Sequence, residues 1–145
     1  MLFSSLIKDG YDESAYLEAV PQLHGPLRFK YRPIPTEDAS EFFEQSQKLK
    51  AREADRKTAK LIKDRLIEWD LKEKGEHVPI TQANVLRLRR RLFQRLGSVI
   101  LGIEACDLDP TWPEEEQDEF VALKSGAEPG QTFGAAREAA DAKNS

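Results

Sequence analysis

Apolar side chains recur at helical spacing in two neighbouring segments near the middle of the chain. The first stripe consists of Ala59, Ile62, Leu66 and Trp69. The second consists of Val85, Leu88, Leu92, Leu96, Val99 and Ile103. Steps of three and four residues place each set on one face of an α-helix. The pattern predicts a helix hairpin between Lys57 and Gly102, with Gly75 ending the first helix and the two stripes packed together.

Residues suited to helix ends accompany these stripes. Thr36 and Thr81 are each placed to act as an N-cap, and acidic residues follow Thr36 where the helix dipole favours them. Gly102 is a suitable stop for the last helix. No proline or glycine interrupts residues 37–70, but residues 48–60 are strongly polar. The pattern leaves open whether this stretch is one helix or two.

A single strand is also indicated ahead of the helices. Leu27, Phe29 and Tyr31 alternate with Arg28, Lys30 and Arg32. This period of two gives the strand one apolar and one basic face. Because an isolated strand is not stable, it is expected to pair with residues 1–20 or with another chain.

Together these elements predict a mostly α fold with a small N-terminal β element, an α+β class. The expected organisation is an N-terminal arm and β element in residues 1–35, a helical core in 36–103 and an acidic, largely disordered tail in 104–145. Within that tail, residues 114–119 are expected to open a short helix.

Charge is distributed unevenly along the 145 residues. Residues 48–95 hold fifteen Lys and Arg against seven Asp and Glu, whereas residues 104–145 hold three against eleven. One interpretation is a solvated basic face with a solubilising tail. The other is that the tail screens the basic face, or that this face binds an acidic partner.

The densest basic cluster lies on the second predicted helix, where Arg87, Arg91 and Arg95 would share one face. Nucleic-acid binding is one hypothesis for this cluster, because phosphate contacts need only positioned cations. Against it stand an acidic pI near 5.3 and a connection too long for a helix-turn-helix. A solvated or subunit-facing cluster is the favoured interpretation.

The candidate chemistry is sparse. Cys106 is the single cysteine, so it cannot form an internal disulfide, and with His24 and His77 it does not make a zinc-binding set. Cys106 is interpreted as a packing residue. No catalytic, cofactor or metal motif is apparent, so a non-enzymatic protein is expected. No apolar run has the length of a membrane span and no signal peptide is evident, which predicts a soluble, intracellular protein.

The order of motifs resembles that of a known family. Leu27–Pro33 precedes a charged helix, Leu66–Asp70 follows it, and Val78–Thr81 leads into a leucine-striped helix that ends at Val99–Gly102. Over residues 24–103 this order is similar to that of tail assembly chaperones of tailed phages and prophages. The resemblance implies a non-enzymatic helper in the cytoplasm of a bacterial host, with the tape-measure protein or another tail protein as its partner.

A hypothetical partner-binding face follows from an incompletely covered second stripe. Its members are Leu92, Phe93, Leu96 and Ile100. Two alternative functions remain. One is a virion structural or connector protein in which the 1–20 arm and the 27–32 strand pair with a neighbouring subunit. The other is a nucleic-acid-binding protein using the Arg87–Arg95 cluster. Homo-oligomerisation is left open.

Overall fold

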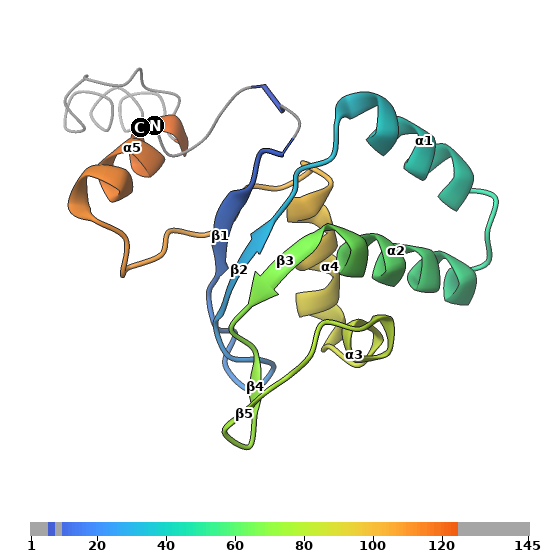
Figure 1. The fold of residues 1–145 in the computed structure, drawn as a ribbon, viewed down its shortest axis with the longest axis horizontal. Coiled ribbons are helices and arrows are strands. Elements are labelled where there is room, and N and C mark those ends of the chain that lie inside the picture. The colour runs from blue at the N-terminus through green and yellow to red at the C-terminus, as the bar shows by residue number, and fades with distance from the viewer. Residues whose placement is uncertain (1–5, 8–9, 125–145) are drawn as a thin grey trace, which may run out of the picture. The chain divides into compact units, whose positions relative to one another are not determined.

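The computed structural model describes residues 6–7 and 10–124, which divide into two compact units at residue 107. The larger unit, residues 6–107, contains an antiparallel sheet in the order β1 (Glu13–Leu17), β2 (Leu27–Tyr31) and β3 (Leu66–Trp69) (Figure 1). The boundary proposed at residue 35 therefore does not separate two compact units, because β2 pairs with a strand that lies beyond it.

The predicted strand is confirmed as β2, the central strand of this sheet. Leu27, Phe29 and Tyr31 are buried, and the intervening basic side chains are half-buried. The expected pairing with the N-terminal region is also confirmed, since β1 lies beside β2 with Ala15 opposite Phe29. Both neighbours of β2 come from the same chain, so this strand is completed without a second subunit.

Residues 36–65 form two helices, which resolves the question that the sequence left open. They are α1 (Thr36–Ser46) and α2 (Ala51–Arg65), joined by residues 47–50. The side chain of Lys57 on α2 contacts α1. Its Nζ donates to Oε1 of Gln45 at 2.5 Å and lies 5.3 Å from the ring centroid of Phe42. The predicted Thr36 N-cap is wrong, because the capping position is Pro35 and no side chain caps this helix.

The prediction that the first helix extends to Trp69 is wrong. Helix α2 ends at Arg65, and the chain becomes extended at Leu66. The register shifts between Lys30 and Tyr31: Tyr31 faces Leu66, but Lys30 faces Glu68. Ile67 is thus an extra residue in the strand, and a bulge of this kind reverses the alternation of side chains. Leu66 and Trp69 are consequently buried on the same side, at a spacing of three that imitates a helix.

Gly75 does not end a helix as predicted. It lies in the turn of a short hairpin between β4 (Lys72–Glu73) and β5 (Glu76–His77). Lys74 and Gly75 both have positive φ, 53° and 80°. Positive φ at both central residues is the requirement of the type I′ turn, whose twist matches that of paired strands.

The second predicted helix is divided into α3 (Gln82–Leu86) and α4 (Arg90–Ile100). The Thr81 N-cap is confirmed, since its Oγ1 accepts from the backbone N–H of Asn84 at 3.1 Å. The stop at Gly102 is also confirmed: its φ of 76° is the left-handed conformation that glycine adopts without strain.

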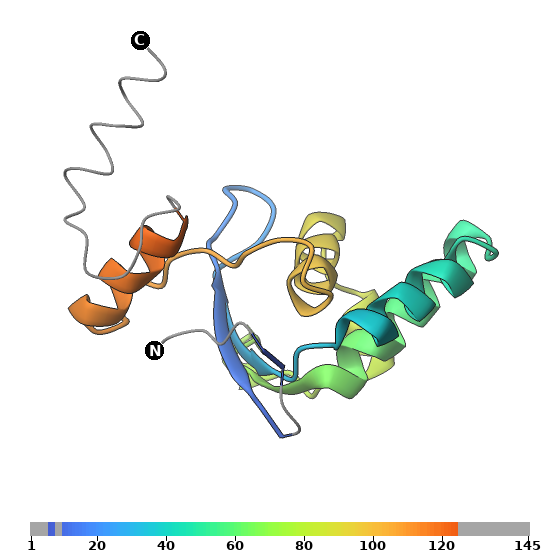
Figure 2. The ribbon, with the colours of Figure 1, turned by 90° about the horizontal axis from the view of Figure 1, so that it is seen from above.

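Helix α4 lies over one face of the sheet and packs against α2 (Figures 1 and 2). Gly97 favours the close approach, because a Cβ there would lie 3.3 Å from Cγ2 of Thr58 on α2, which is tighter than most contacts of this kind. The largest fully buried side chains of this core are Leu17, Leu27, Ile62, Val85, Leu96 and Ile100. They come from the sheet, α2, α3 and α4, so one core joins the β element to the helices.

The described part of the smaller unit spans residues 108–124. It contains α5 (Glu114–Lys124), whose first turn is acidic as predicted. The rings of Trp112 and Phe120 meet edge to face with centroids 5.6 Å apart. The predicted disorder of residues 125–145 lies outside the described residues.

Candidate partner-binding cleft

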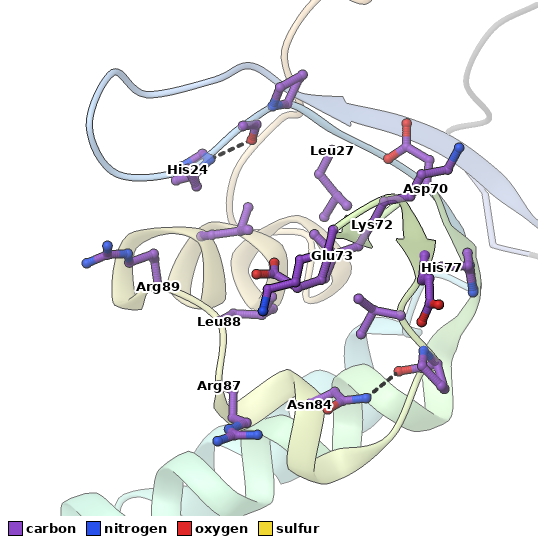
Figure 3. A pocket seen from close by; sticks show the side chains of 18 of the residues that line it. His24, Leu27, Asp70, Lys72, Glu73, His77, Asn84, Arg87, Leu88 and Arg89 are labelled. Carbon is purple, nitrogen blue, oxygen red and sulfur yellow. Dashed lines mark hydrogen bonds between the residues drawn. The ribbon is translucent and has the colours of Figure 1, made fainter.

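An open cleft of about 1230 Å³ lies within the larger unit (Figure 3). Its walls come from three parts of the chain: the turn at residues 23–27, the hairpin region at 70–79, and residues 84–92 around the α3–α4 connection. The 23–27 turn is distant in sequence from the other two segments, and the fold of the larger unit brings all three together.

The cleft has an apolar base. Leu27 and Leu92 are buried there, while Leu71, Val78 and Leu88 are half-buried. Exposed and half-exposed aliphatic side chains in a concave surface are suited to receive an apolar side chain from a ligand.

The hairpin wall is fixed to the sheet through Trp69. Its Nε1 donates to the backbone carbonyl of Val78 at 2.7 Å, and its own carbonyl lies 3.0 Å from Nε2 of His77. Asn84 on α3 donates through Nδ2 to the carbonyl of Pro79 at 3.0 Å (Figure 3). These bonds hold residues 77–79 between the sheet and α3 and so define one side of the cleft.

The two charged sides of the cleft differ. On the hairpin, Lys72 and Lys74 are balanced by Glu73 and Glu76. Asp70 is engaged by Arg28, whose backbone N–H donates to Oδ1 at 2.8 Å and whose guanidinium lies 3.7 Å from Oδ2.

On the opposite side, Arg87 and Arg89 are exposed (Figure 3), and the structure records no ion pair for either among the described residues. The cleft therefore has a cationic side formed by the α3–α4 connection.

The predicted arginine face on one helix is wrong. Arg87 follows the end of α3, and only Arg91 and Arg95 belong to α4. Arg95 is engaged elsewhere: its guanidinium donates to both carboxylate oxygens of Asp107, at 2.7 and 3.3 Å, and to Glu104 at 3.4 Å. The hydrogen bond to Asp107 is the main cause that raises the pKa of Arg95. Of the three, Arg87 alone lines the cleft.

The predicted partner-binding face is also wrong. Leu92, Phe93, Leu96 and Ile100 are all buried within the chain. They form the side of α4 that packs inward, so they are unavailable as a surface. Leu92 alone reaches the cleft, as part of its base.

Asp107 joins the segment after α4 to the backbone of β1 and of the residue that follows it. Besides binding Arg95, its carboxylate accepts from the backbone N–H of Glu18 at 2.9 Å, and its backbone N–H donates to Tyr16 at 2.8 Å. The side chains of Arg95 and Asp107 are 22% and 17% exposed. This partial burial makes the pair stronger than an ordinary surface ion pair.

Asp107→Ala is expected to lower the free energy of unfolding by about 1–3 kcal/mol, because charged hydrogen bonds are lost and Arg95 keeps only its longer 3.4 Å contact with Glu104. Urea unfolding measures this change. Asp55→Ala is the matched control, since it removes the equally short but more exposed Arg90–Asp55 pair and should cost below about 1 kcal/mol. Equal losses in the free energy of unfolding in the two variants would contradict this role for Asp107.

The remaining candidate residues have structural roles. Cys106 is buried, and burial is the main cause that raises the pKa of its thiol, in agreement with packing. His24 Nδ1 lies 2.8 Å from the carbonyl of Gly25. His24 and His77 both line the cleft. Among the described residues, no group of three or more His, Cys, Asp or Glu is arranged to hold a metal ion.

Sequence reasoning missed the cleft because its walls depend on the 23–27 turn and the hairpin. The available signal was Lys74-Gly75 between two pairs of polar residues, a turn signal that helical periodicity outweighed.

Comparison with protein-family models, curated proteins and solved structures finds no match for this chain. No helix within the described residues is long and apolar enough to cross a membrane. The basis for a functional proposal is therefore the cleft itself and the order of motifs in residues 24–103.

Proposed function

We propose that this chain is a non-enzymatic morphogenesis protein of a tailed phage or prophage, a tail assembly chaperone that binds the tape-measure protein in the bacterial cytoplasm. The observation that carries the proposal is the cleft, which combines an apolar base with a cationic side. The resemblance of residues 24–103 to tail assembly chaperones supplies the identity of the partner.

Binding in such a cleft accounts for a chaperone's action. A tape-measure protein exposes apolar segments until tail subunits cover them, and exposed apolar segments associate with one another. A chaperone that covers part of such a segment lowers the apolar surface available for aggregation. Since the α4 face is buried, the cleft takes the place of that face in the proposal.

Co-expression tests this function. The tape-measure protein encoded by the same phage or prophage is produced with and without this chain, and its soluble fraction is measured after centrifugation. The expected result is a severalfold larger soluble fraction with the chain present, together with co-purification of the two proteins. An unrelated acidic protein of similar size serves as the control. An unchanged soluble fraction without co-purification would overturn the proposal.

The connector alternative has less support. It requires the 1–20 arm and the 27–32 strand to pair with a neighbouring subunit, whereas β2 is already paired on both sides by β1, which belongs to that arm, and by β3. Mass spectrometry of purified particles separates the two functions: a chaperone is absent from mature tails, whereas a connector is present at a fixed number of copies.

A further inference from the structure

The cationic side of the cleft is not neutralised within the described residues. Four other arginines of the larger unit have carboxylate partners: Arg28 pairs with Asp70, Arg32 with Asp12, Arg90 with Asp55 and Arg95 with Asp107.

No such partner is recorded for Arg87 or Arg89, which line the cleft, or for Arg91, which follows them at the start of α4. Free positive charge is therefore concentrated at one side of a concave surface, where a negatively charged ligand would supply the missing partners.

The base and the far side restrict the ligand further. Leu71, Val78 and Leu88 present apolar surface, which favours an aliphatic side chain over a purely ionic ligand. On the hairpin Lys72 and Lys74 are balanced by Glu73 and Glu76, so only one side of the cleft attracts anions, which favours a short acidic segment over a continuous polyanion. No Phe, Tyr or Trp is among the described residues that line the cleft, so the cleft lacks the aromatic stacking platform typical of single-stranded nucleic-acid sites.

We propose that the cleft binds an acidic segment of a partner polypeptide that also carries an aliphatic side chain. Carboxylates of the segment pair with Arg87 and Arg89, and the aliphatic side chain lies between Leu71 and Leu88. Planar guanidinium groups bind carboxylates with two parallel hydrogen bonds, which gives direction as well as affinity. This inference rests on the proposed function, because it specifies the chemistry of the chaperone's partner segment.

Selection from a random peptide library tests the ligand chemistry without assuming the tape-measure protein. The full chain is immobilised, and peptides are selected that bind it. Selected peptides are expected to combine Asp or Glu with Leu, Ile or Val. One selected peptide is then labelled, and its dissociation constant is measured by fluorescence anisotropy at several salt concentrations. Affinity is expected to fall as salt rises.

Arg87→Glu with Arg89→Glu is the decisive variant. Both side chains are exposed, so the fold should persist, which thermal melting followed by circular dichroism checks. The variant is expected to bind the peptide about tenfold more weakly or worse. The matched control is Arg52→Glu with Lys60→Glu, the same charge change on exposed positions of α2, and it should bind as the wild type does.

Several outcomes would overturn the inference. They are selection of basic or uncharged peptides, unchanged affinity in the Arg87→Glu, Arg89→Glu variant, or displacement of the peptide by duplex DNA at low concentration. A dimer, detected by light scattering and abolished by this variant, would assign the cleft to a second copy of the chain instead.

The co-expression experiment, repeated with the same variant, separates this inference from the proposed function. If the variant still keeps the tape-measure protein soluble, the function stands and the cleft is not the site. If wild type binds acidic peptides but has no effect on the tape-measure protein, the cleft stands and the function is wrong.

Discussion

Leu96→Ala is expected to lower the free energy of unfolding by about 2–5 kcal/mol. Leu96 has no exposed surface and lies on the side of α4 that faces the core. The substitution removes buried methyl groups and leaves a cavity that close-packed neighbours fill only in part. Alanine is itself a good helix former, so the loss would come from packing and not from the helix. Urea unfolding followed by circular dichroism measures it.

Leu86→Ala is the control for this substitution. It makes the same chemical change at the end of α3, where the side chain is 40% exposed, and should cost below about 1 kcal/mol. The pair of variants distinguishes a core role for α4 from a partner-binding role. Destabilisation of both variants by the same small amount would show that Leu96 is not a core residue.

Trp69→Ala is expected to lower the free energy of unfolding by about 3–5 kcal/mol. The indole is 3% exposed and carries the 2.7 Å hydrogen bond that fixes Val78. Its loss removes a large buried ring and also releases the hairpin wall of the cleft. We also expect the Trp69→Ala variant to bind a selected acidic peptide more weakly than the wild type. Fluorescence anisotropy measures this under conditions in which the variant remains folded.

Trp69→Phe separates the ring from its hydrogen bond. Phenylalanine retains most of the apolar surface but leaves the carbonyl of Val78 without its donor, a change worth about 1–3 kcal/mol. Ile67→Ala, at the 40% exposed bulge position of the same strand, is the control and should cost less than Trp69→Phe. A Trp69→Phe variant as stable as the wild type would argue against the indole bond.

Local sequence determined those elements whose stabilising contacts lie within a few residues. The alternation in residues 27–31 identifies β2 because one apolar face is sufficient to define a half-buried strand. The Thr81 hydroxyl accepts from the backbone N–H of Asn84, three residues away, and Gly102 adopts the positive φ that its own position requires. The acidic first turn of α5 is the same kind of local signal, because acidic residues are favoured at a helix N-terminus.

Tertiary structure decided the elements whose identity depends on distant partners. Leu66 and Trp69 are spaced as in a helix, but pairing with β2 makes them a strand, and the bulge at Ile67 produces the misleading spacing. The leucine stripe of α4 was visible in the sequence, but whether it faces a partner or the chain's own core depended on how α2 and the sheet pack around it. Periodicity specifies that a face is apolar, and only the fold specifies what covers it.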